Sequence, residues 1–223
     1  MSKIYLISGL GADWRMFQFL RLPPHLPFQH VEWLAPAHVN EPIREYAQRL
    51  VTQYTLEPDA ILLGLSYGGL IAIEVAKLLR VRKVILISSL DNRNGLPWHY
   101  RALGKTNLHR WVPFTLLKAM HPLAPLLFGA YTPEEKRLLR TAILEIDELF
   151  LRWSLGQVLV WEQEQPPKNL VHIHGTHDRI LPLHDRPDVI KVKNGGHLMV
   201  MHQAEEISLI LAEILKDTSE HDR

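Results

Sequence analysis

The sequence predicts an α/β fold: a mostly parallel, doubly wound sheet of about six strands with helices on both faces. Short β-branched apolar runs alternate along the chain with longer segments of helical period. The chain has 223 residues, of which 47% are hydrophobic and 22% charged, enough apolar material for one substantial core. Right-handed strand–helix–strand crossovers then place the strands side by side in one sheet.

The expected strands are short and rich in Val, Ile and Leu. They are predicted at residues 4–8, 31–34, 60–65, 83–88, 170–174 and 189–192. Helices are predicted where apolar residues recur three and four positions apart, at residues 13–20, 43–54, 67–80 and 203–216. With no internal repeat and no linker composition in view, residues 1–223 are expected to form a single domain.

One long stretch, residues 96–165, interrupts this alternation. It contains no convincing strand, and its helical pieces are separated by prolines and rich in Trp, Leu and Phe. We interpret it as a helical lid inserted after the fourth strand; the alternative is extra core packed on the edge of the sheet. Candidate pocket-lining side chains in such a lid are Trp98, Tyr100, Trp111, Phe114, Leu117, Met120, Leu123, Leu127 and Phe128.

Composition excludes several classes of function. The 25 Lys and Arg balance 24 Asp and Glu, so the net charge of +1 provides no field suited to nucleic acid or a membrane surface. The absence of cysteine excludes disulfides, thiolate zinc sites and a cysteine nucleophile. The apolar run Ile4–Ile7 is too short for the core of a signal peptide, and no long uncharged stretch follows. We therefore expect a cytoplasmic protein whose partner is a small molecule; the sequence does not specify an oligomeric state.

The strongest local motif is a G-x-S-x-G pattern at residues 64–68. It follows an apolar strand and opens a helical segment, which is the context that a nucleophilic serine on a sharp turn requires. Such a turn strains the backbone at Ser66, and side chains at Gly64 and Gly68 would collide across it. The helix N-terminus also favours negative charge that develops there. Ser66 is thus the candidate nucleophile, with a simple helix cap as the alternative.

Two later turns complete a resemblance to the α/β-hydrolase superfamily. After the fifth strand, residues 172–182 resemble the family's G-x-x-D-x-x-x-P loop, in which Asp178 matches the triad acid. After the sixth strand, residues 195–197 resemble its Gly-Gly-His turn, in which His197 matches the general base. The order Ser, Asp, His is the one expected of the α/β-hydrolase fold. The resemblance covers nearly the whole chain except residues 96–165 and implies the sheet order 4-3-5-6-7-8 in the family's strand numbering.

The segment after the first strand, residues 8–14, resembles the family's oxyanion loop, usually written His-Gly-x-Gly. Ser8 replaces the usual His. The resemblance implies that the backbone N–H groups of Leu10 and Tyr67 stabilise the oxyanion of a tetrahedral intermediate, and backbone donors do not depend on the side chain at position 8. A dinucleotide-binding loop begins similarly, but Trp14 stands where its third glycine is required. We therefore expect no nucleotide cofactor.

Two alternatives compete for the residues near the predicted acid. His172, His174 and His177 cluster with Asp178 in the sequence, so a metal site is an alternative. The triad loop already accounts for Asp178, and no metal is expected. Asp91 follows the fourth strand, the other strand end from which some members of this fold take their acid, and is the alternative to Asp178.

The resemblance implies a small serine esterase or thioesterase that cleaves a carboxylic ester or thioester through an acyl-enzyme, with no metal or organic cofactor. The same triad supports C–C hydrolases, lyases, acyltransferases and cofactor-free peroxidases, so these reactions stay open. The alternative of another class is a non-catalytic ligand-binding protein on a hydrolase scaffold. The presence of all three candidate residues argues against it.

Overall fold

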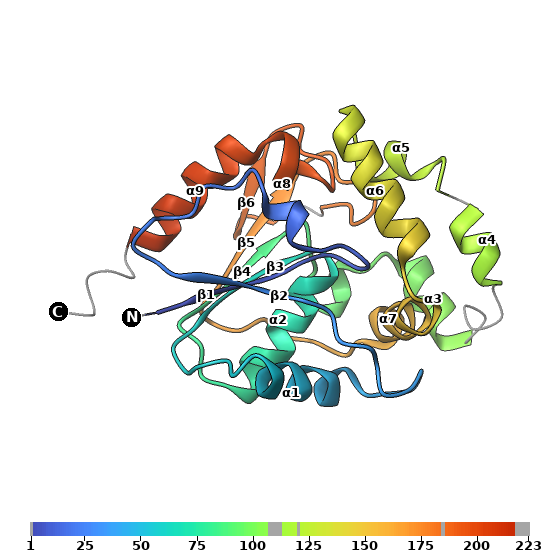
Figure 1. Ribbon diagram of the computed structural model, residues 1–223, viewed down its shortest axis with the longest axis horizontal. Helices are drawn as coiled ribbons and strands as arrows, with labels where there is room; N and C mark the ends of the chain where they lie inside the picture. The colour runs from blue at the N-terminus through green and yellow to red at the C-terminus, as the bar shows by residue number, and fades with distance from the viewer. Residues whose placement is uncertain (1, 107–112, 120, 184–185, 217–223) are drawn as a thin grey trace.

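The computed structural model (Figure 1) describes residues 2–106, 113–119, 121–183 and 186–216, without the side chains of Lys105 and Leu117. Within these residues, six strands pair in parallel in the order β2-β1-β3-β4-β5-β6. They are β1 (Ile4–Ile7), β2 (Phe28–Val31), β3 (Ile61–Leu65), β4 (Lys83–Ile87), β5 (Leu170–Gly175) and β6 (Val189–Val192). The predicted doubly wound parallel sheet and its strand order are confirmed.

Two predicted elements differ from the structure. β2 occupies residues 28–31 rather than 31–34, because its only neighbour is β1, whose last residue Ile7 pairs with Val31. Beyond Val31 the chain leaves the sheet, and the backbone N–H and C=O of Leu34 bond instead to the Tyr46 hydroxyl. The helix expected at 13–20 is reduced to a short 3-10 turn, η1 (Trp14–Phe17).

Helices cover both faces of the sheet (Figure 1): α1 (Ile43–Gln53) and α2 (Tyr67–Leu78) lie on one face, and η1, α8 (Met199–His202) and α9 (Ala204–Lys216) on the other. Alternate residues of β1 show how the two halves of the core are built. Tyr5 and Ile7 pack among the residues of α1 and α2, whereas Ile4 and Leu6 pack among those of α8 and α9. Burial on both faces explains why the strands are continuously apolar.

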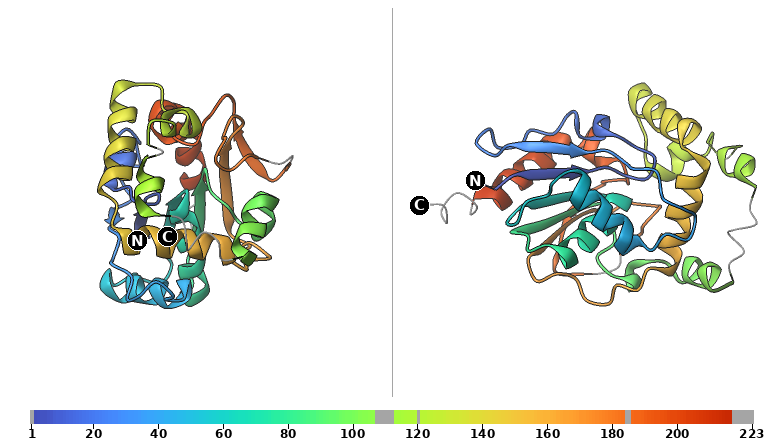
Figure 2. Two further views of the ribbon diagram at one scale, coloured as in Figure 1. Left: turned by 90° about the vertical axis from the view of Figure 1, so that its right-hand side faces the viewer. Right: turned by 60° about the horizontal axis from the view of Figure 1, so that its bottom comes forward.

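Residues 96–165 hold five helices among the described residues: α3 (Trp98–Thr106), α4 (Phe114–Ala119), α5 (Ala124–Phe128), α6 (Pro133–Glu145) and α7 (Glu148–Val160). They lie beyond the carboxyl ends of the strands (Figures 1 and 2). Part of the segment is core, since Trp153 of α7 is fully buried and its indole donates to the Glu41 carbonyl at 2.7 Å. No helix in the described ranges is long and apolar enough to cross a bilayer.

Candidate active site

Ser66 lies on the turn between β3 and α2. Its backbone has φ 51° and ψ −120°, and residues other than glycine rarely adopt such a positive φ. Three hydrogen bonds hold this conformation: the Ser66 N–H donates to the Ile87 carbonyl at 3.0 Å, and the Ser66 carbonyl accepts from the Gly69 N–H at 2.9 Å and the Ser89 hydroxyl at 2.6 Å. A strained residue held so firmly is typical of a functional position.

The two glycines of the motif are required by close backbone approach. A Cβ on Gly64 would lie 2.5 Å from the Cα of Gly69, and a Cβ on Gly68 would lie 2.2 Å from the carbonyl oxygen of Ile7. Both distances are shorter than any non-bonded contact between such atoms, so the collision expected from the sequence is confirmed. Glycine at these positions allows α2 to start directly against β1 and lifts the Ser66 side chain above the sheet.

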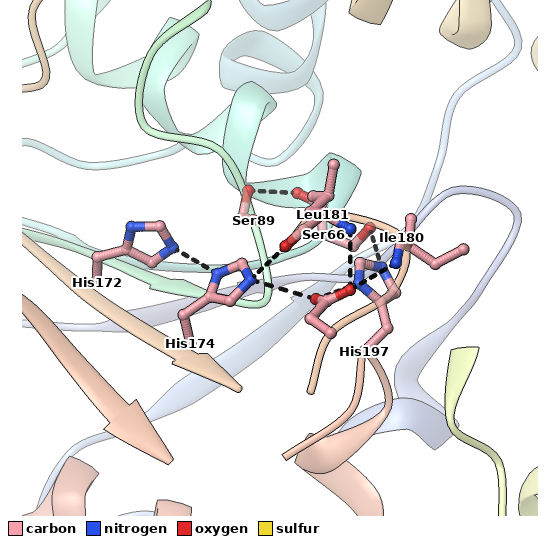
Figure 3. A network of polar contacts seen from close by, with 8 residues as sticks. Ser66, Ser89, His172, His174, Ile180, Leu181 and His197 are labelled. Carbon is pink, nitrogen blue, oxygen red and sulfur yellow. Dashed lines mark hydrogen bonds and ion pairs between the residues drawn. The ribbon is translucent and has the colours of Figure 1, made fainter. Parts of the chain in front are cut away.

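The structure brings together the three predicted site residues in one hydrogen-bonded chain (Figure 3). The Oγ of Ser66 lies 2.8 Å from Nε2 of His197, and Nδ1 of His197 lies 2.7 Å from Oδ2 of Asp178. His197 is 2% exposed and Asp178 5% exposed. The turns that carry the imidazole and the carboxylate are joined directly, because the His177 N–H donates to the Gly195 carbonyl at 2.8 Å.

Asp178 is held ionised by its surroundings. Its Oδ1 accepts the backbone N–H groups of Ile180 and Leu181, each at 2.9 Å. Burial alone would raise the pKa of Asp178, but the electrostatic attraction of His197 and the hydrogen bonds to His174, His197 and the backbone outweigh it and hold the pKa well below its usual range. With the carboxylate ionised, Nδ1 of His197 carries the proton and Nε2 is left to accept the hydroxyl of Ser66.

A second histidine contacts the same carboxylate and was not predicted to do so. Nε2 of His174 lies 2.8 Å from the Leu181 carbonyl and 3.3 Å from Oδ2 of Asp178, so this nitrogen donates. Nδ1 of His174 then accepts from Nε2 of His172 at 3.0 Å, which extends the chain by one more ring (Figure 3). The spacing of two along β5, which puts both rings on one face, was the available signal.

The described side chains of these histidines are not arranged as the ligands of one metal ion. His177 is exposed, and its Nδ1 lies 3.1 Å from the hydroxyl of Thr176, its neighbour in the chain. Across residues 2–106, 113–119, 121–183 and 186–216, no group of three or more His, Asp or Glu side chains is arranged to hold a metal ion.

The buried His172 makes stability depend on pH. Burial and the neighbouring His174 disfavour its charged form and lower the pKa of His172 from 6.5 to about 4. The unfolded chain therefore binds a proton between these values that the folded protein does not, so stability falls as the pH is lowered through this window. The contribution is at most about 1.4 kcal/mol for each pH unit.

We expect His172→Gln to flatten this dependence, because glutamine keeps an amide donor for His174 but does not titrate. Urea denaturation of both proteins at a series of pH values from 6.5 to 4 measures the two slopes. Equal slopes in the two proteins would show that His172 is not the titrating group.

The alternative acid, Asp91, lies outside the hydrogen-bonded chain of Ser66, His197 and Asp178. It is buried in the segment that follows β4, where its two oxygens pair with the guanidinium of Arg186 at 2.7 and 2.6 Å, and Oδ1 also accepts from the side chain of Asn92. No contact between Asp91 and His197 occurs in the part of the chain that the structure describes. The pair ties the segment after β4 to the loop that precedes β6.

The loop after β1 lies beside Ser66, as expected of the predicted oxyanion loop. A Cβ built on Gly9 would be 3.5 Å from the Cβ of Ser66. The N–H groups of Leu10 and Tyr67 donate no hydrogen bond to any described residue, and Tyr67 starts α2, where N–H groups have no partner within the helix. Trp33, which no sequence motif marks, donates its indole N–H to the carbonyls of Gly9 and Ala12, each at 3.1 Å.

Of the side chains expected to line a pocket in residues 96–165, Phe128 reaches the site. Its ring packs edge-on against that of His197, with 5.3 Å between the ring centroids. The carbonyl of Phe128 accepts the Leu198 N–H at 3.1 Å. Trp98 and Leu123 are instead 74% and 55% exposed. Trp111, Met120 and the side chain of Leu117 lie outside the described residues.

Solved structures with a similar fold include several esterases. An esterase from Thermogutta terrifontis, with malate bound, matches with a TM-score of 0.67 and 18% identity over 97% of this chain and 90% of its own. An esterase from Exiguobacterium antarcticum matches with a TM-score of 0.63 and 16% identity over 97% and 92%. A hydrolase from Oleispira antarctica matches with a TM-score of 0.65 and 15% identity over 97% of this chain and 92% of its own.

Among curated protein sequences, none matches this chain. The sequence model of the alpha/beta hydrolase family, in contrast, matches residues 4–208, which include all six strands and the three residues of the hydrogen-bonded chain. The parallel sheet and the strained serine turn are consistent with this match. The protein belongs to the alpha/beta hydrolase family.

Proposed function

We propose that the protein is a serine hydrolase that cleaves a carboxylic ester or thioester through an acyl-enzyme intermediate. The observation that carries the proposal is the continuous chain from Ser66 Oγ through His197 to Asp178, with distances of 2.8 and 2.7 Å. A serine hydroxyl is a weak nucleophile until a base within hydrogen-bond reach accepts its proton. The esterases with a similar fold add support for the class of reaction.

In the proposed mechanism each of these residues takes one step. Ser66 Oγ attacks the substrate carbonyl as its proton passes to Nε2 of His197, and ionised Asp178 stabilises the imidazolium. The N–H groups of Leu10 and Tyr67 then donate to the oxyanion. The intermediate collapses as His197 returns the proton to the leaving alcohol or thiol, and a water molecule, activated by His197 in the same way, hydrolyses the acyl-enzyme.

Residues 96–165 would act as a lid over this site. Support comes from α5, whose last residue, Phe128, packs on the imidazole of His197 and bonds to the turn that follows it. On the acid side, the guanidinium of Arg179 donates to the Leu126 carbonyl of α5 at 3.1 Å. The substrate's acyl group would thus be selected by side chains of this segment next to the base.

A fluorophosphonate probe tests the proposal directly, because it phosphonylates only a serine activated by a base. We expect one adduct per chain, and peptide mass spectrometry should locate it on Ser66. Assays with p-nitrophenyl esters and acyl thioesters of increasing acyl length should then reveal which bond is cleaved. A chain that stays unlabelled and binds these compounds without turnover would be a ligand-binding protein on the same scaffold, contrary to the proposal.

A further inference from the structure

Trp33 lies in the loop after β2 and reaches across to the loop after β1. Its single N–H is shared between the carbonyls of Gly9 and Ala12 at 3.1 Å each, and the Ala12 N–H also donates to the Gly9 carbonyl at 3.0 Å. The Gly9 carbonyl is therefore held by two donors. Both lie on the side of the loop where Trp33 packs.

The orientation of this carbonyl determines that of the proposed oxyanion donor. The C=O of Gly9 and the N–H of Leu10 belong to the same planar trans peptide group, so they point in opposite directions. Fixing the carbonyl on the Trp33 side leaves the Leu10 N–H free on the opposite side. In the flipped peptide the carbonyl oxygen would replace the N–H, and its partial negative charge would repel the oxyanion instead of stabilising it.

The indole also packs against the second segment that supplies an oxyanion donor. The centroid of its ring lies 5.6 Å from the ring centroid of Tyr67 and 5.3 Å from that of Phe150 in α7. Trp33 is thus in contact with both segments that carry the two N–H groups. Contacts of this kind fix the separation of two donors that come from distant parts of the chain.

Ser8 also bonds to the backbone of this loop. Its hydroxyl donates to the Ala12 carbonyl at 2.6 Å, so this oxygen accepts both Ser8 Oγ and Trp33 Nε1. The residue that departs from the usual His of the family's oxyanion loop therefore has a role in this chain. It acts on the loop's backbone together with Trp33.

We propose that Trp33 is a positioning residue for the oxyanion hole, which its indole N–H keeps in the productive peptide orientation. This inference rests on the proposed function, since it presumes an oxyanion formed at Ser66. It predicts an effect on the transition state rather than on substrate binding, because the full negative charge on the oxygen develops only as the tetrahedral intermediate forms.

The test is Trp33→Phe, with Trp153→Phe as the matched control. Trp153 belongs to the same aromatic cluster, with its ring 5.9 Å from that of Tyr67, and its indole N–H donates to the Glu41 carbonyl, away from the oxyanion loop. Both variants lose one indole N–H and some ring area. We expect Trp33→Phe to lower kcat roughly 10- to 100-fold with little change in KM, less than the loss of a whole oxyanion donor.

A trifluoromethyl ketone inhibitor provides the specific readout, because its tetrahedral adduct places an oxyanion in the same hole. Its inhibition constant should rise with Trp33→Phe by the same factor as kcat falls. Trp153→Phe should lower the Tm but leave the inhibition constant near that of the wild type. If Trp33→Phe fails to fold, benzothienylalanine at position 33 keeps the bicyclic ring without the N–H and should give the same result.

Equal effects of the two variants on kcat, or an unchanged ketone affinity in the Trp33 variant, would overturn the inference while the proposed function stands. Failure of the proposed function has a different signature. In that case the wild type itself would neither react with the fluorophosphonate nor bind the ketone covalently.

Discussion

Replacing Ser66 by alanine is expected to lower kcat for ester hydrolysis by about 10⁶-fold. The variant removes the only oxygen within 2.8 Å of His197 Nε2 among the described contacts, so the base has no proton to accept and no covalent intermediate forms. The fold should persist, because the bonds that hold this turn involve the backbone of residue 66. Initial-rate assays with the best p-nitrophenyl ester measure the loss of kcat, and circular dichroism measures whether the fold persists.

Ser208→Ala is the matched control for this variant. Its buried hydroxyl bonds to the Ala204 carbonyl and accepts the Arg21 N–H at 2.9 Å, in α9 on the other side of the sheet from α2. The control should lose some stability and keep its turnover. Ser66→Ala turnover within about tenfold of the wild type would remove Ser66 from the mechanism, since triad serines contribute far more than this.

Asp178→Asn is expected to lower kcat by about 10⁴-fold with only a moderate loss of stability. The backbone N–H groups of Ile180 and Leu181 both donate to Oδ1, so the amide oxygen must occupy that position and the NH₂ group must take the place of Oδ2. There it would donate to Nδ1 of His197 and move the ring proton to Nε2. That nitrogen then donates to Ser66 and cannot accept its proton.

Asp91→Asn serves as the control for this variant and tests the alternative acid. Its carboxylate pairs with Arg186, so the substitution should lower the midpoint of urea denaturation while kcat stays near that of the wild type. Kinetics of the two variants side by side decide between the two carboxylates. An inactive Asp91 variant beside an active Asp178 variant would reverse the assignment.

Local patterns predicted the parts of the site that are encoded locally. The serine turn needs glycine at positions 64 and 68, and the structure shows the close contacts that impose this. The turns that carry Asp178 and His197 follow β5 and β6 directly, so their position at the carboxyl ends of the strands follows from the parallel topology. Ser66, Asp178 and His197 were therefore accessible from sequence reasoning.

Features that depend on contacts between distant segments were missed or misplaced. The end of β2 is determined by the length of its neighbour β1, which the residues of β2 do not encode. Trp33 acts on carbonyls 21 and 24 residues away, and no motif marks that relation. Periodicity also could not distinguish Phe128, which meets the imidazole, from Trp98, which faces solvent.

The separation of the reacting groups along the chain has a consequence for biosynthesis. Ser66 and His197 are 131 residues apart, and His197 follows β6, which is the last strand along the chain and an edge strand of the sheet. A nascent chain that has not yet assembled β6 would therefore have no imidazole beside Ser66. In the proposed mechanism, the Ser66 hydroxyl therefore gains its base only when these two distant segments have come together.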